Sequence, residues 1–213
     1  MNIPGHICFI PDGNRRYARK HHLSLSNSYE SGVRKGLEVV EWCKEIGVRD
    51  ISFFGASREN ILLRNTEESI EILKGVLRFC SEILKQSVHL EIFGDLWEER
   101  LLQNGEYQRL IQLLPLPASR KLDELSIYVG IAYSPKSETS EDHRTNGGYL
   151  SDSVPPIDLV IRTGKRFRLS GFLPFQVSNA ELKFLPMLWE EFDKEAFLKA
   201  IRWYARQPRT YGE

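Results

Sequence analysis

The sequence predicts an α/β protein with a six-stranded, mainly parallel sheet flanked by helices. Six short runs rich in β-branched and aromatic residues recur along the 213 residues, with helical patterns between several of them. Most of these runs are almost continuously apolar, which is typical of strands with both faces covered. A chain of this length most simply forms one domain, and we expect a single domain over residues 1–213.

Strands are expected at residues 6–10, 50–55, 89–94, 125–133, 158–163 and 181–186. Between the first two, apolar residues recur with the helical period and Gly47 follows them, which predicts a helix over 30–47. A second helix is expected over 66–86, where two apolar stripes run along the chain. Two interpretations fit this pattern: a helix packed on both sides, or a helix with one stripe lining a cleft for an apolar ligand.

The stretch 134–156 differs from the rest of the chain because it lacks apolar periodicity. Ser, Thr, Asp, Gly and Pro dominate it, which indicates a polar flexible loop. A loop of this length is uncommon within a compact domain and is often a lid or a disordered segment.

The charge balance excludes a strong general attraction to nucleic acid or to an anionic membrane. The 29 Lys and Arg residues balance 29 Asp and Glu residues, so any affinity for phosphate must be local. Cys8, Cys43 and Cys80 lie in apolar settings without a CxxC pattern, which predicts reduced core thiols in a cytoplasmic protein. We expect no signal peptide, because the first strand begins almost at once, and no apolar run approaches the ~20 residues that span a bilayer.

The stretch "IPDGNRRYARK" at 10–20 places one carboxylate at a strand end and a cluster of cations just beyond it. Asp12 would lie at the carboxyl end of a sheet strand, where open α/β sheets bind ligands. Gly13 permits close backbone approach, and the start of the next helix offers N–H groups to an anion. Three arginines add positive charge: Arg15, Arg16 and Arg19. A metal–diphosphate site fits this stretch, although Asp-Gly between apolar runs also fits a hairpin turn.

Two further strand ends carry groups suited to phosphate. The stretch "DLVIRTGKRFRLSGF" at 158–172 gathers donors around Gly164, namely Arg162, Thr163, Lys165, Arg166, Arg168 and Ser170. A diphosphate needs several charge-assisted hydrogen bonds, although a solvated basic loop is the alternative. The stretch "FFGASRENILLR" at 53–64 opens into Ser57, Arg58 and Asn60. Glu181 begins the last expected strand, where a second metal ligand could sit.

Taken together, "HICFIPDGNRRYAR", "SREN", "DLVIRTG", "RLSGFLPFQ" and "LWEEF" resemble the cis-prenyltransferases, the undecaprenyl diphosphate synthase family. The resemblance runs from residue 6 to about residue 206, with the motifs in the order and spacing of that family. It implies a six-stranded parallel sheet with a hydrophobic cleft, and a homodimer.

The resemblance also implies roles for individual residues. An allylic diphosphate would bind at Asp12, Gly13 and Asn14 and at the helix start that carries Arg15 and Arg16, with Arg19 and Asn60 as further substrate-binding residues. Isopentenyl diphosphate would be held by Arg162, Arg168 and Ser170. One Mg²⁺ would lie between the diphosphates, with Asp12 and Glu181 of the partner subunit as ligands. Asn14 and Ser57 match family positions that orient the condensation.

The function implied is a Mg²⁺-dependent prenyltransferase that condenses an allylic prenyl diphosphate with isopentenyl diphosphate to a (Z)-prenyl diphosphate. No organic cofactor is expected, because the chain lacks GxGxxG and GxxxxGK[ST]. Membrane contact is expected only through the lipid product. One alternative is irregular coupling of two allylic diphosphates such as dimethylallyl diphosphate. Another is the non-catalytic subunit of a heteromeric enzyme, which would be expected to lose Asp12 and the phosphate-binding arginines.

Departures from the family pattern concern the allylic side. Leu25 and Tyr29 stand where relatives usually carry Arg and His, and Leu63-Arg64 replaces an Arg-Pro pair. We expect Leu25 and Tyr29 to add bulk near the allylic entrance. Three bulky residues of the helix at 66–86 are expected to close the cleft floor: Leu73, Leu77 and Phe79. These features predict short- or medium-chain products.

Overall fold

The computed structural model describes residues 2–64, 66–96, 99–103, 105–112, 124–138 and 151–208. In this part of the chain a six-stranded sheet has the order β3-β4-β2-β1-β5-β6, and every neighbouring pair is parallel. Its strands are β1 (His6–Ile10), β2 (Asp50–Ser57), β3 (His89–Phe93), β4 (Ser126–Tyr133), β5 (Leu159–Arg162) and β6 (Glu181–Phe184). The predicted fold class is therefore confirmed, and each strand lies where the sequence predicted it.

The first helices follow the first two strands: α1 (Asn14–Lys20), α2 (Leu25–Glu45), α3 (Arg58–Leu62) and α4 (Thr66–Ile83). The later ones are α5 (Glu99–Leu102), α6 (Gly105–Gln112), α7 (Pro135–Glu138), the 3₁₀ helix η1 (Trp189–Glu191) and α9 (Lys194–Tyr204). α2 begins earlier than predicted because Ser24 caps it, its Oγ accepting a hydrogen bond from the Asn27 amide at 3.2 Å. Since β1 continues into α1 and pairs only with parallel strands, the hairpin interpretation of 10–20 is wrong.

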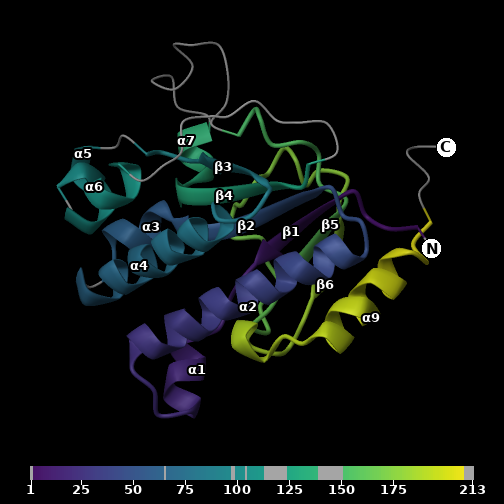
Figure 1. Ribbon diagram of the computed structural model, residues 1–213, viewed down its shortest axis with the longest axis horizontal. Coiled ribbons are helices and arrows are strands. Elements are labelled where there is room, and N and C mark those ends of the chain that lie inside the picture. The colour runs from purple at the N-terminus through teal and green to yellow at the C-terminus, as the bar shows by residue number, and fades with distance from the viewer. Residues whose placement is uncertain are drawn as a thin grey trace.

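The sheet has a helical side and a side covered largely by irregular chain. α2, α4 and α9 pack on one face (Figure 1), where Phe9 stacks on Phe53 at 5.4 Å between ring centroids. On the other face, Cys8 and Ile10 pack against residues of the segments 151–157 and 169–180. Successive residues of β1 thus point into two different clusters, as the period of a strand requires.

Helix α4 uses both of its apolar stripes. Leu73 and Cys80 are buried in the main core, while Ile72, Val76 and Phe79 line an apolar cavity described below. The two interpretations of the stripes at 66–86 therefore both apply. α4 is packed on more than one side, and one of its stripes also faces a cavity.

The three cysteines are unpaired and buried, as predicted. Burial raises the pKa of the Cys8, Cys43 and Cys80 thiols, that of Cys80 to about 12, so all three stay protonated at neutral pH. No helix in the described residues is long and apolar enough to cross a membrane. The loop predicted at 134–156 is described only at its two ends, because residues 139–150 lie outside the described residues. Its first part forms the helical turn α7, and its last part contains the buried residues Ser151 and Val154.

A buried histidine links the amino ends of three strands. The Nδ1 of His6 lies 3.0 Å from the Pro155 carbonyl oxygen, and its Nε2 lies 2.8 Å from Ser52 Oγ. Because a carbonyl oxygen can only accept, Nδ1 carries the proton and Nε2 accepts from the Ser52 hydroxyl. Burial lowers the pKa of His6 to about 4, although the nearby Asp50 and Asp158 act in the opposite direction.

Stability should therefore fall as the pH drops from about 6.5 towards 4. In this window the unfolded chain binds a proton on His6 that the folded chain does not, so the contribution of His6 to the free energy of unfolding falls by up to about 3 kcal/mol and becomes constant below about pH 4. Urea unfolding of the wild type and of His6→Gln at pH 7.5, 6 and 5 measures this effect. The slope of the free energy of unfolding against pH should be smaller in the variant by about 1 kcal/mol per pH unit. Equal slopes in the two proteins would contradict the assignment.

Candidate active site

The carboxyl ends of β1, β2 and β5 open into a polar pocket of about 410 Å³. Its described lining includes seven arginines: Arg15, Arg16, Arg19, Arg64, Arg162, Arg166 and Arg168. Only two carboxylates, Asp12 and Glu59, belong to the same described lining. The excess of five positive charges suits a polyanion such as a diphosphate.

Asp12 lies at the centre of this pocket between two guanidinium groups. Its Oδ1 is 2.9 Å from Arg16 Nη2, and its Oδ2 is 2.9 Å from Arg162 Nη2. Arg162 is only 4% exposed, and its Nη1 also donates to the Arg168 carbonyl at 2.6 Å and to Ser170 Oγ at 2.8 Å. Since Ile10 is level with Arg162 in the β1–β5 pair, the sheet register brings these two strand ends together.

The backbone around Asp12 is locked to the chain that follows β5. The Asp12 amide donates to Thr163 Oγ1 at 3.0 Å, and Arg16 Nη1 donates to the Gly164 carbonyl at 2.7 Å. Gly164 has φ +83°, and a Cβ there would lie 2.5 Å from Arg16 Nη2 and 2.7 Å from the Asp12 carbonyl oxygen. A side chain at this position would therefore push the Asp12–Arg16 pair apart.

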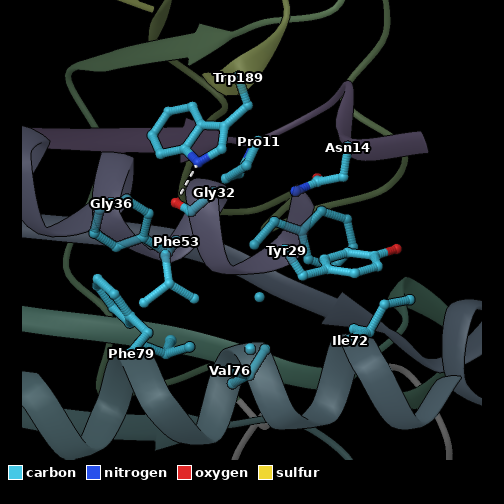
Figure 2. Close-up of a pocket in the computed structure, with 15 residues that line it drawn as sticks. Pro11, Asn14, Tyr29, Gly32, Gly36, Phe53, Ile72, Val76, Phe79 and Trp189 are labelled. Carbon is cyan, nitrogen blue, oxygen red and sulfur yellow. Dashed lines mark hydrogen bonds between the residues drawn. The ribbon is translucent and has the colours of Figure 1, made fainter. Parts of the chain in front are cut away.

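The polar pocket continues into an apolar cavity of about 110 Å³ between α2, α4 and the sheet (Figure 2). Six residues line both spaces: Pro11, Asn14, Tyr29, Phe54, Gly55 and Ile72. The deeper part of the cavity is bounded by Phe79, Val76 and Trp189, whose Nε1 donates to the Gly32 carbonyl at 2.9 Å. The two spaces form one cleft that is cationic at its mouth and apolar inside.

The glycines of α2 keep this cavity open. A Cβ on Gly32 would lie 2.7 Å from Asn14 Nδ2, and one on Gly36 would lie 3.1 Å from Phe79 Cε2. Side chains at these positions would therefore collide with the wall and the junction of the cleft.

The structure brings together all but one of the residues to which the resemblance assigned a catalytic, substrate-binding or metal-binding role, whereas the expected donors Arg58, Thr163 and Lys165 are absent from the described lining. The polar pocket is lined by Asp12, Gly13, Asn14, Arg15, Arg16, Arg19, Ser57, Asn60, Arg162, Arg168 and Ser170. Ser57 also caps α3, its Oγ accepting from the Asn60 amide at 3.0 Å. Glu181 is the exception: it begins β6 level with Leu159 and Ile7, roughly 16 Å along the strands from Asp12.

One cationic lining residue, Arg64, was not assigned to the site by the sequence analysis, although it ends a stretch recognised as phosphate-suited and its charge was a usable signal. Arg166, which was expected among the donors around Gly164, also lines the polar pocket. Tyr29 lies at the junction, as expected of a residue near the allylic entrance, whereas Leu25 lines neither described space. The expected floor residues Leu73 and Leu77 do not line the cavity either, because the stripe with Ile72, Val76 and Phe79 faces it instead.

Asp12 is the residue best placed to hold a divalent cation. Among the described residues no group of three or more His, Cys, Asp or Glu side chains could form an all-protein metal site. Mg²⁺ is usually bound through one or two carboxylates together with substrate phosphates and waters, so Asp12 in an arginine-lined pocket fits its chemistry.

The chain is similar to known proteins along almost its whole length. The family described as "Putative undecaprenyl diphosphate synthase" matches residues 10–212. The isoprenyl transferase of Thermotoga maritima is 29% identical, with 100% of this chain and 98% of that protein aligned. The tritrans,polycis-undecaprenyl-diphosphate synthase (geranylgeranyl-diphosphate specific) of Thermoplasma acidophilum is 31% identical, over 98% of this chain and 89% of that protein.

The fold is shared with a solved structure. The crystal structure of lavandulyl diphosphate synthase from Lavandula x intermedia, in complex with dimethylallyl diphosphate, matches with a TM-score of 0.80. The match covers 99% of both chains at 21% identity.

Gly164→Ala should weaken pyrophosphate binding by about tenfold or more, because the new methyl group displaces Arg16 from Asp12. Gly47→Ala is the matched control: Gly47 has a similar φ of +80°, but a Cβ there has nothing within 4 Å. Both variants carry the same backbone strain of about 1–2 kcal/mol. Calorimetric titration with pyrophosphate should separate them, and equal affinities would show that this contact does not shape the pocket.

Proposed function

Because the chain belongs to the undecaprenyl diphosphate synthase family of cis-prenyltransferases, we propose that it condenses an allylic prenyl diphosphate with isopentenyl diphosphate. The product would be a (Z)-prenyl diphosphate of short or medium length. The observation that carries this proposal is the continuous cleft, in which a pocket lined by seven arginines opens into an apolar cavity. A prenyl diphosphate has the same division between a highly charged head and an apolar tail.

The contacts around Asp12 suggest how the two diphosphates are held. The allylic diphosphate would bind at the start of α1, beside Arg15 and Arg16, with its chain pointing past Asn14 into the cavity. Isopentenyl diphosphate would bind at the chain after β5, where Arg162 is fixed and Arg168 lines the pocket. Arg162 would then lie between the two heads, because it pairs with Asp12.

The reaction needs charge stabilisation at one end and exclusion of water at the other. The double bond of isopentenyl diphosphate would attack C1 of the donor, and the C1–O bond would break with its electron pair leaving on diphosphate. The acceptor would then lose a proton to the released diphosphate, a base that the reaction itself supplies. The arginines stabilise the charge that grows on the departing diphosphate. The apolar walls beside the junction shield the developing allylic cation from water. Asn14, which lines both spaces, and Ser57, which lines the polar pocket, would orient the reacting groups.

A bound Mg²⁺ would add Lewis-acid stabilisation of the leaving diphosphate. Asp12 would hold it, and the two arginines beside Asp12 orient its carboxylate. Within one chain Glu181 is remote, so its proposed role as a ligand requires Glu181 of the partner subunit and therefore a homodimer.

A second candidate is the irregular coupling of two allylic diphosphates, such as dimethylallyl diphosphate. The volume of the apolar cavity favours it, because about 110 Å³ is less than the roughly 150 Å³ of a cavity that binds benzene. Such a space suits about one isoprene unit. The role of a non-catalytic subunit is disfavoured, because Asp12, Arg162 and Arg168 line the same pocket.

Incubation with Mg²⁺, labelled isopentenyl diphosphate and a panel of allylic diphosphates tests the proposal directly. The wild type should form a chain-elongated (Z)-product, and Asp12→Ala should lower the turnover number by about 100-fold or more. Asp12→Asn, which keeps the side-chain shape, controls for loss of folding. Near-normal turnover in folded Asp12 variants would refute the site. Label-free products formed from dimethylallyl diphosphate alone would instead favour irregular coupling.

Product length should depend on Phe79 and not on Leu77, although both belong to α4. Phe79 lines the cavity and meets Phe53 at 5.0 Å between ring centroids, whereas Leu77 packs elsewhere. Phe79→Leu should therefore lengthen the main product by at least one isoprene unit, and Leu77→Ala should leave it unchanged. Chromatography of dephosphorylated products measures this. Ten or more isoprene units from the wild type under limiting isopentenyl diphosphate would refute a steric limit.

A further inference from the structure

Glu68 is a buried carboxylate beside the mouth of the cleft that the proposed chemistry does not use. It lies in the first turn of α4 and is only 6% exposed. Three side chains meet one of its oxygens, Oε1: Arg15 Nε at 3.4 Å, the Tyr29 hydroxyl at 3.4 Å, and Arg64 Nη1 in a short ion pair. A buried carboxylate is expensive to desolvate, so it persists only where such donors converge on it.

The three partners of Glu68 all belong to the cleft. Arg15 and Arg64 line the polar pocket, and Tyr29 lines both the polar pocket and the apolar cavity. Arg64 Nη1 also lies 3.4 Å from the Tyr29 oxygen, so the phenol contacts both members of the ion pair. Burial raises the pKa of Tyr29 to about 12, and the phenol therefore stays protonated and donates to the carboxylate.

The ring of Tyr29 lies where the cleft changes from polar to apolar. Figure 2 shows it between Asn14 and Ile72, at the other end of the cavity from Phe79. A Cβ built on Gly75 would lie 3.7 Å from the Cβ of Tyr29, so the α4 backbone passes close to the base of this side chain, while Glu68 and Arg64 contact its hydroxyl tip. Because its tip is held by an ion pair and its ring lines both spaces, Tyr29 is fixed at the junction between the polar pocket and the apolar cavity.

We propose that Glu68 is a positioning residue which, with Arg64, fixes the Tyr29 ring at the junction and thereby restricts the allylic donor to a short chain of about one isoprene unit. This inference rests on the proposed function, because it names the donor class for the same site. Discrimination by one or a few methylenes at a fixed wall typically reaches 10- to 200-fold. The Tyr29 ring therefore has to be held in place for the cleft to prefer a short donor over a long one.

Other charged residues of α4 offer a matched control. Glu82 pairs with Lys85 at 2.7 Å, one turn apart on the exposed surface, where such pairs contribute little to stability. Glu82→Gln makes the same chemical change as Glu68→Gln on the same helix without touching the cleft.

The test compares dimethylallyl, geranyl and farnesyl diphosphates as donors in the wild type, Glu68→Gln, Tyr29→Phe, Tyr29→Ala and Glu82→Gln. Thermal unfolding checks that each variant is folded, and binding of the unreactive thiolodiphosphate analogues is measured by calorimetry. In Glu68→Gln the ratio of kcat/KM for farnesyl over dimethylallyl diphosphate should rise by about tenfold or more. Tyr29→Ala should raise it further, Tyr29→Phe should raise it less, and Glu82→Gln should match the wild type. The KM for isopentenyl diphosphate should change by less than about twofold throughout.

An unchanged donor ratio in both Glu68→Gln and Tyr29→Ala would overturn the inference. An equal loss for every donor would also overturn it, since that result would make Glu68 a general structural or diphosphate-binding residue. A wild type that turns over no donor would refute the proposed function instead. In that case the binding measurements still decide the inference. If the cluster selects chain length, the affinity for the farnesyl analogue relative to the dimethylallyl analogue should be higher in Glu68→Gln than in the wild type.

Discussion

The contact on which the rest of the site depends is the pair between Asp12 and the buried Arg162. It joins the ends of β1 and β5, which are adjacent because the parallel register sets Ile10 level with Arg162. The Arg162 guanidinium is 4% exposed, and its two Nη groups donate to Asp12, the Arg168 carbonyl and Ser170, while its buried Nε has no hydrogen-bond partner among the described residues. The same pair therefore shapes the chain after β5 and holds the Asp12 carboxylate at the centre of the cationic pocket.

The apolar half of the cleft follows from the packing of two helices on one side of the sheet. α2 approaches Asn14 through Gly32 and approaches Phe79 through Gly36, with no side chain between them. The resulting apolar cavity adjoins the arginine-lined pocket directly, because Asn14 lines both spaces. Charge stabilisation and water exclusion are thus side by side, which is what a reaction with a departing diphosphate and a carbocation requires.

The sequence was sufficient to predict the strands and most of the polar site, because parallel strands end at one edge and Asp12 and Arg162 each follow or end an apolar run. It could not place Glu181 relative to Asp12, since this depends on the register of β6, which begins level with Ile7. Nor could it choose between the two stripes of α4. That choice, like the meeting of Tyr29 with Glu68, depends on how α2 and α4 pack.

Chain length in such a cleft has to be limited by repulsion and not by weak attraction. Each buried methylene of a prenyl chain adds about 0.8 kcal/mol, so longer chains bind more tightly until a wall stops them. Here the inner wall includes Phe79, which also packs on Phe53 of β2, and the outer wall includes Tyr29, which is held by Glu68. Both walls are part of the packing that attaches α2 and α4 to the sheet. Substitutions that enlarge the cavity therefore also remove stabilising contacts, so any longer product of the proposed reaction would come with a less stable helical side of the fold.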